Sequence, residues 1–168
     1  MMKKFIYILL AAVVAASCTV KYSLSGASIP PDAKTFSVAY FPNNAAMVTP
    51  MLSSTLTEAL VDKFSRSTRL TQVPEGGDFA FEGEIVGYTS ATASVSSNDY
   101  ALQNRLTITI RVRFTNLVDE KASFSNRTFS AYADYDATKL LTEVEGELIT
   151  QIVEQLVNDV FQAAAGNW

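Results

Sequence analysis

The chain has 168 residues, of which 13 are basic, 17 are acidic and none is histidine, so its formal net charge at pH 7 is −4. A negative chain lacks the basic field that non-specific nucleic-acid binding requires. The missing histidine removes the commonest metal ligand and general base. Composition therefore argues against nucleic-acid binding, and the sequence has no Ser-His or Cys-His catalytic pair.

The first 17 residues have the pattern of an export signal. A basic start precedes an apolar run over residues 5–16, which is short for a membrane span and suits the hydrophobic region of a signal peptide. Small side chains at residues 15–17 come directly before Cys18, the only cysteine. This pattern resembles a bacterial lipoprotein signal, which implies acyl chains attached to Cys18 that hold the protein on a membrane. The alternative is an ordinary signal followed by an incidental cysteine.

Removal of the signal makes the mature chain more acidic. Lys3 and Lys4 leave with it, so 11 basic residues remain against 17 acidic ones, a net of −6. Thr19 follows the cysteine in place of the aspartate that retains lipoproteins in the inner membrane. By this resemblance we expect a protein anchored in the outer membrane and facing the periplasm. Residues 18–33, rich in serine, glycine and proline, are predicted to be a lipidated tether, and residues 34–168 a single domain.

One stretch of the domain alternates without exception. From Arg105 to Phe114 every even position is apolar and every odd position is polar or basic. A period of two over ten residues predicts a half-buried strand, which we expect at the centre of a sheet. The predicted elements, in chain order, are a strand over 35–41, a helix from 49–50 to 65–68, a short strand over 69–73, long strands over 78–88, 105–114 and 122–133, and a helix over 137–163.

Several local features of these elements are predicted as well. Thr49 and Pro50 suit the N-cap and first position of the first helix. Gly83 and Gly87 indicate a bulge, a bend or a close backbone neighbour inside their strand. A slip in the apolar phase predicts a bulge near Asn126.

Further predictions concern the ends of the long elements and the fold class. The strand that begins at residue 78 is expected to extend to a loop at 96–99, and Gly166 is expected to give the last helix a left-handed cap. The fold class is therefore α+β, a two-layer sandwich with a mostly antiparallel sheet of four to five strands and two helices on one face.

Two acidic residues could be mistaken for catalytic groups. Glu82 and Glu84 share one strand face and could act as a carboxylate pair in a hydrolase. The favoured interpretation is structural, because hairpin pairing would place them opposite Arg111 and Arg113 as cross-strand ion pairs. We therefore predict no catalytic residue, no metal ligand and no cofactor.

Basic residues on the open sheet face are candidates for anion binding. Arg105, Arg111 and Arg113 share one side of their strand, and Arg127 could join them from the next strand. Arginine forks match the geometry of phosphate oxygens, so this row could bind the phosphates of lipopolysaccharide. The alternative is a solvated or ion-paired face without a ligand.

Six short segments stand in a fixed order along the mature chain. They are Gly26-Ala27-Ser28-Ile29-Pro30-Pro31, Tyr40-Phe41-Pro42-Asn43-Asn44-Ala45, Leu56-Thr57-Glu58-Ala59-Leu60, Phe81-Glu82-Gly83-Glu84-Ile85, Arg111-Val112-Arg113-Phe114-Thr115-Asn116 and Tyr132-Ala133-Asp134-Tyr135. In this order they resemble the lipopolysaccharide-assembly lipoprotein family LptE. The resemblance covers essentially the whole mature chain, although no single segment is a chemical signature.

The resemblance implies a non-enzymatic lipoprotein that plugs the lumen of the β-barrel LptD, helps to assemble it and supports transport of lipopolysaccharide to the outer leaflet. A plug needs polar surface, because bacterial barrel interiors are hydrophilic. The polar strand face and the hydroxyl-rich tip over residues 89–98 are expected to meet the barrel wall. The alternative function is a lipoprotein regulator or activator of a periplasmic cell-wall enzyme.

Overall fold

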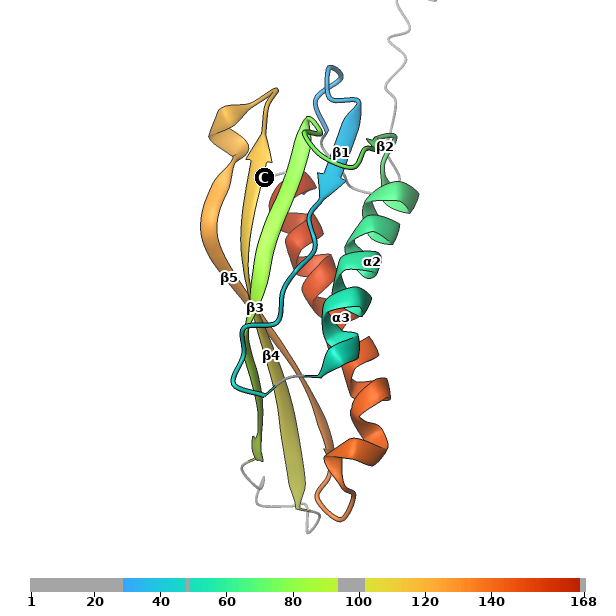
Figure 1. Ribbon diagram of the computed structural model, residues 1–168, viewed down its shortest axis with the longest axis vertical. Helices are drawn as coiled ribbons and strands as arrows, with labels where there is room; N and C mark the ends of the chain where they lie inside the picture. Colours follow the sequence, from blue (N-terminus) through green and yellow to red (C-terminus); the bar gives the residue numbers. More distant parts are fainter. Residues whose placement is uncertain (1–28, 48, 94–101, 167–168) are drawn as a thin grey trace, which may run out of the picture.

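The computed structural model describes residues 29–47, 49–93 and 102–166. In this part of the chain a five-stranded sheet and two long helices form the two layers of an α+β sandwich, as predicted (Figure 1). The elements are β1 (Thr35–Val38), α2 (Pro50–Ser67), β2 (Thr71–Gln72), β3 (Phe79–Thr92), β4 (Gln103–Asn116), the 3₁₀ turn η1 (Glu120–Ala122), β5 (Phe124–Asp136) and α3 (Leu141–Ala165). Cys18, the tether up to residue 28 and the predicted loop at 96–99 lie outside the described residues.

The sheet has the order β2-β1-β3-β4-β5, which corrects one expectation. We expected the alternating strand that became β4 to be central, but β3 holds the middle position. The reason is that β1 runs parallel to β3 and pairs with it, with Val38 opposite Phe81. Alternation reports which face of a strand is buried, and it carries no information about the number of strands on either side.

The antiparallel pairing of β3 with β4 fixes the two faces of the sheet. The even residues of β4 from Leu106 to Phe114 are almost completely buried, as the alternation predicts. Their partners include Phe81, opposite Phe114, and Ile85, opposite Ile110. Because cross-strand partners share a face, one side of the sheet is a continuous apolar surface.

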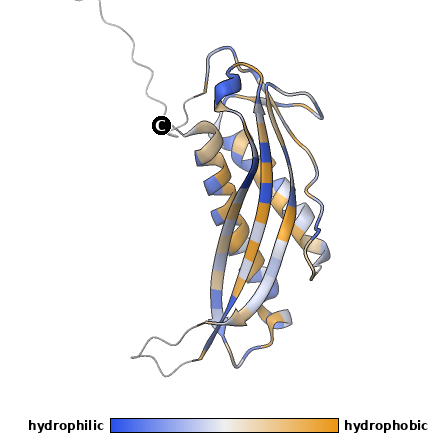
Figure 2. Ribbon diagram, turned by 90° about the vertical axis from the view of Figure 1, so that its left-hand side faces the viewer, coloured by the Kyte–Doolittle hydropathy of each residue, from blue (hydrophilic) through white to orange (hydrophobic). Residues whose placement is uncertain are grey.

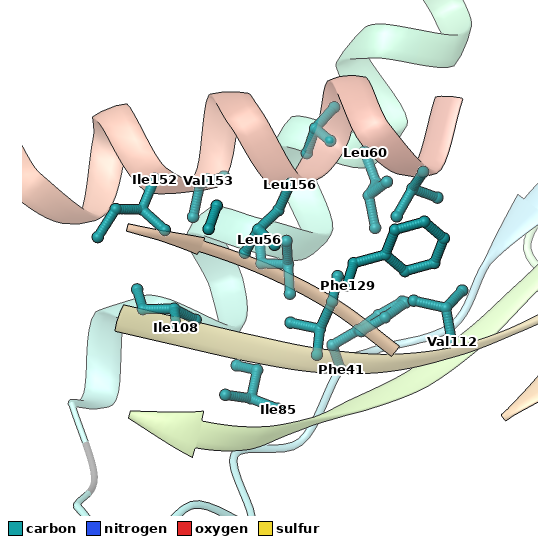
Figure 3. Packing of buried hydrophobic residues seen from close by; sticks show 14 of the residues in the cluster. Phe41, Leu56, Leu60, Ile85, Ile108, Val112, Phe129, Ile152, Val153 and Leu156 are labelled. Carbon is teal, nitrogen blue, oxygen red and sulfur yellow. The ribbon is translucent and has the colours of Figure 1, made fainter. Parts of the chain in front are cut away.

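Both helices cover this apolar surface. Figure 3 shows Leu56 and Leu60 of α2, together with Ile152 and Leu156 of α3, pointing toward the buried side chains of the strands. Phe64 of α2 contacts both the sheet and the other helix. Its ring centroid lies 4.5 Å from that of Phe81 in β3 and 5.1 Å from that of Phe161 in α3. The apolar stripes at helical spacing are therefore core, as predicted.

Two bulges change the phase of the long strands, as predicted. In β3 the register shifts between Ile85 and Gly87, which lets Tyr88 return to the buried face. In β5 the register shifts where Asn126 adopts a φ of 56°. Asparagine is one of the few residues that adopt this left-handed conformation readily.

Gly83 is the close backbone neighbour that its strand position predicted. A Cβ atom at this position would collide with the carbonyl oxygen of Arg111 and the ring of Phe41. Phe41 is fully buried there, because the chain after β1 continues along β3: the Ile85 N–H donates to the Pro42 carbonyl at 2.9 Å. Regular strand β1 itself ends at Val38, three residues earlier than predicted.

Two predicted helix caps differ in detail. Thr49 is the N-cap of α2 and Pro50 follows at the first helical position, but the Thr49 hydroxyl does not cap the helix. It donates to Glu145 Oε1 of α3 at 2.8 Å, and the Tyr88 hydroxyl donates to the same oxygen. Burial is the larger cause, and this hydrogen bond to Glu145 the next, that raises the pKa of Tyr88 to about 12.

Gly166 ends α3 in an extended backbone conformation with a φ of −69°, so the expected left-handed cap is wrong.

We expect Gly83→Ala to lower the free energy of unfolding by about 1 to 3 kcal/mol, the usual cost of forcing extra volume into a packed core. Gly146→Ala is the matched control, because nothing lies within 4 Å of a Cβ at that exposed position inside α3. Alanine there should raise stability by up to about 1 kcal/mol, through its higher helix propensity. Urea unfolding of both variants and the parent measures this, and a Gly83→Ala variant as stable as the parent would contradict the packing described.

Candidate functional site

The sheet face opposite the helices is the candidate functional surface. Figure 2 looks onto this face, with the helices behind the strands. Its side chains form cross-strand rows in which polar residues dominate. These rows, which we call the open face, are Ala80 with Thr115, Glu82 with Arg113, Glu84 with Arg111 and Thr128, Thr109 with Ser130, Thr107 with Tyr132, and Arg105 with Asp134.

The predicted ion pairs between β3 and β4 are present. Arg111 Nη1 lies 2.8 Å from Glu84 Oε1, and Asn44 Nδ2 donates to the other oxygen of Glu84 at 2.7 Å. Arg113 Nη1 lies 3.7 Å from Glu82 Oε2, a looser contact between exposed side chains. Both carboxylates that could have suggested a hydrolase are thus engaged by arginine, as the hairpin register predicted.

Arg105 makes a more ordered pair at the other end of the face. Its Nε and Nη2 donate to the two carboxylate oxygens of Asp134 at 2.7 and 2.9 Å, a bidentate fork. The guanidinium carbon also lies 3.7 Å from the centre of the Tyr132 ring. The hydrogen bond to Arg105 lowers the pKa of Asp134, and the same bond raises the pKa of Arg105.

Arg127 does not join the other arginines. It is the cross-strand partner of Val112, which is fully buried on the helix side, so the two residues share that face of the sheet. Its guanidinium lies 5.4 Å from the ring centre of Phe124 and 5.3 Å from that of Phe129. The bulge at Asn126 determines which face of the sheet Arg127 occupies, and the sequence pattern alone did not predict that face.

The three arginines of the open face are all engaged by carboxylates. Arg105, Arg111 and Arg113 are each paired with one carboxylate, from Asp134, Glu84 and Glu82. Arg113 is the least engaged, because its side chain is 58% exposed and its contact with Glu82 is the longest of the three. A shallow cavity of about 320 Å³ lies beside it, and its lining includes Gly83 and the ion pairs that Glu82 and Glu84 form with Arg113 and Arg111. A phosphate could compete for Arg113 more readily than for the fork of Arg105.

Two features of this face were missed at the level of sequence. Asp134 and Tyr132 hold Arg105, and extending the two-residue alternation along β5 would have placed them beside it.

The second feature is a cavity of about 760 Å³ where the loop over residues 74–77 passes β1. Exposed Tyr40 and Leu117 are among its lining residues. This loop is held by Asp78, whose pKa is lowered by hydrogen bonds from the Lys34 and Thr35 backbone and the Thr35 hydroxyl. No periodic signal marks such a loop.

The described residues also limit the chemistry of the site. Among residues 29–47, 49–93 and 102–166, no three histidine, cysteine, aspartate or glutamate side chains come together as a metal site would require. The same part of the chain holds no helix with the length and apolar character of a membrane span.

Solved structures resemble this fold at low sequence identity. The hypothetical protein CT253 from Chlamydia trachomatis superposes with a TM-score of 0.52 and 11% identity, over 80% of this chain and 99% of that one. Protein XCC0632 from Xanthomonas campestris superposes with a TM-score of 0.50 and 11% identity, over 80% of this chain and 87% of that one. At such identities the likeness concerns the fold alone. No curated protein sequence matches this chain.

A family model gives the more specific result. The model described as LptE, lipopolysaccharide-assembly, matches residues 33–164, which span every strand and all but the last residue of the helices described above. The match includes the ion-paired rows of the open face and both bulges. The chain therefore belongs to the LptE lipopolysaccharide-assembly family.

Proposed function

We propose that this protein is an outer-membrane lipoprotein that plugs a β-barrel translocon of the LptD type, helps to assemble it and so supports lipopolysaccharide transport to the outer leaflet. Membership of the LptE family supports the role in lipopolysaccharide assembly. The observation that supports the plug is the open face, a broad polar surface whose three arginines are each paired with a carboxylate and over which no helix lies (Figure 2). A water-filled, hydrophilic barrel lumen suits such a surface.

A polar face whose arginines are paired with carboxylates is better suited to contact a polar lumen wall than a face with many unpaired charges. Each arginine already has a carboxylate partner, so the surface can approach a polar wall without leaving an unpaired charge behind. Hydroxyls fill the space between the ion pairs, and Thr109 and Ser130 lie 3.0 Å apart, oxygen to oxygen. These groups can both donate and accept hydrogen bonds, which lets one surface meet many arrangements of polar side chains.

The point where the tether enters the domain fits an anchor at Cys18. Arg69 Nη2 donates to the Pro30 carbonyl at 2.6 Å and to the Ile29 carbonyl at 3.2 Å, so the start of the domain is held beside the end of α2. Ten residues separate Ile29 from Cys18. Fully extended, the eleven steps from Cys18 to Ile29 reach at most about 40 Å. An acylated Cys18 would therefore keep this end of the molecule close to the membrane surface.

Purification of the tagged lipoprotein from outer membranes in mild detergent tests the proposal. We expect a large β-barrel protein to be recovered with it in equal amount, because a plug is a stoichiometric part of its barrel. Recovery of the lipoprotein alone would count against the plug. Recovery of an inner-membrane cell-wall synthase would instead favour the alternative, a regulator of a periplasmic enzyme.

The arginine row is also proposed to bind lipopolysaccharide phosphates, and the ion pairs direct the test to Arg111 and Arg113. We expect changing both to Ala to weaken lipopolysaccharide binding by at least about tenfold, since a single hydrogen bond to a charged group is worth about 1.5 to 3 kcal/mol. The loss should shrink as salt is raised, because salt screens exposed charges. Arg127→Ala is the matched control on the opposite face. Binding that is unchanged in the double variant would reduce these arginines to ion-pair partners of the scaffold.

A further inference from the structure

The β5 edge is the one long free edge that the described sheet has. β5 spans 13 residues and pairs with β4 on one side only, whereas β2 at the opposite edge spans two residues. A long free edge exposes a row of backbone donors and acceptors to which another strand can pair. Proteins usually carry features that prevent another strand from pairing with such an edge, so the residues along β5 indicate whether pairing is possible.

The outward-facing backbone groups of β5 follow from its register. The Ala137 N–H donates to the Leu102 carbonyl at 3.0 Å, and the ladder continues from this pair in steps of two. The odd residues of β5 therefore bond β4, while the N–H and C=O groups of the even residues point away from the sheet. These outward residues include Thr128, Ser130, Tyr132 and Asp134. One of these outward groups already has a side-chain partner: Gln155 Nε2 of α3 donates to the Tyr132 carbonyl at 3.4 Å.

The middle of this edge is touched by one side chain, that of Gln155, and otherwise carries little of the usual protection. From Thr128 to Ala133 there is no charged residue and no proline. The bulge at Asn126 disturbs only the beginning of the strand. Lysine, proline and central bulges are among the devices that keep foreign strands from edges, and a covering helix is another. The absence of lysine, proline and bulges from these six consecutive residues leaves a regular stretch on which a strand can form.

We infer that the β5 edge accepts an extended segment of a different protein as a sixth strand of the sheet. Side chains of that segment would alternate between the open face and the side of α3, which packs along β5. Gln155 lies nearest the edge on that side, and Gln151 and Asp159 follow it one turn away on the same helix face. The whole of α3 holds five acidic residues and no Lys or Arg. The segment should therefore present basic or uncharged polar side chains toward α3.

A second copy of this chain fits the edge poorly. Antiparallel pairing of two β5 strands extends one sheet across a two-fold axis, which places both helix layers on the same side. The two α3 helices would then flank the joint, and neither has a Lys or Arg to offset its acidic residues, although Glu145 and Glu154 face α2 and only Asp159 lies on the helix face beside the edge. Like charges held together in this way oppose the association. A heterologous, cationic or neutral segment meets no such repulsion.

This inference rests on the proposed function only for the identity of the partner. Every strand in the wall of a closed barrel is already paired on both sides. If the partner is the barrel protein, the segment that pairs with β5 must come from outside the wall strands, from a loop or a terminal extension.

The test uses the full lipoprotein in its native outer membrane. A photo-crosslinking amino acid replaces Tyr132, which is 48% exposed on β5, or Tyr40, a matched control that is 63% exposed and follows β1, three strands away. Each is combined with Ser130→Pro or Ser130→Ala. Proline removes an outward N–H and no ladder bond, while alanine removes only the hydroxyl. Thr128→Lys repeats the block without altering the backbone.

We expect the Tyr132 probe to give a product that maps to one extended basic or neutral segment of a different protein, and the Tyr40 probe not to give it. Ser130→Pro and Thr128→Lys should each reduce this product roughly tenfold, a loss of about 1.4 kcal/mol, and Ser130→Ala should leave it nearly unchanged. The inference is overturned by a product that is a dimer of this chain, by no product, or by a product that both blocking variants leave intact. A mapped partner that is not a barrel protein would contradict the proposed function and leave the strand pairing standing.

Discussion

The antiparallel pairing of β3 with β4 is the constraint on which the rest of the structure depends. It places Phe81 opposite Phe114 on one face and Glu84 opposite Arg111 on the other. A shift of one residue would exchange the two faces, burying charges and exposing the aromatic core. The bulge at Gly87 keeps this assignment through the far half of the hairpin, because it returns Tyr88 to the apolar side.

The two faces then acquire different roles. The apolar face packs against α2 and α3, and the rings of Phe64 and Phe161 are neighbours within this core. The polar face has no further structural task once its ion pairs are formed, so it is free to meet a partner. Its arginines are each paired with a carboxylate, whereas α3 keeps a net negative charge. The molecule thus offers a polar sheet face, the acidic helix α3 and, between them, the open edge of β5.

Much of this arrangement could be predicted from the residues. The alternation from Arg105 to Phe114, the stripes of the two helices and the phase slip near Asn126 report local periodicity, and local periodicity determines which face is buried. The ion pairs of Glu82 and Glu84 followed from hairpin register. The central position of β3 could not be predicted, because parallel pairing with β1 depends on contacts distant in sequence. The side taken by Arg127 depended on one residue of bulge geometry, and the Thr49 hydroxyl was drawn away from its helix by Glu145.

Solvent access at the open face, measured with and without the barrel, shows whether this face meets the barrel wall. Cys18 is the only cysteine and is the proposed lipid site, so a Thr109→Cys variant would offer a single free thiol in the middle of that face. We expect a water-soluble maleimide to label this thiol readily in the free protein and only weakly in the barrel complex. Equal labelling in both states would show that the face stays open to water, which contradicts a plug that meets the barrel wall through it.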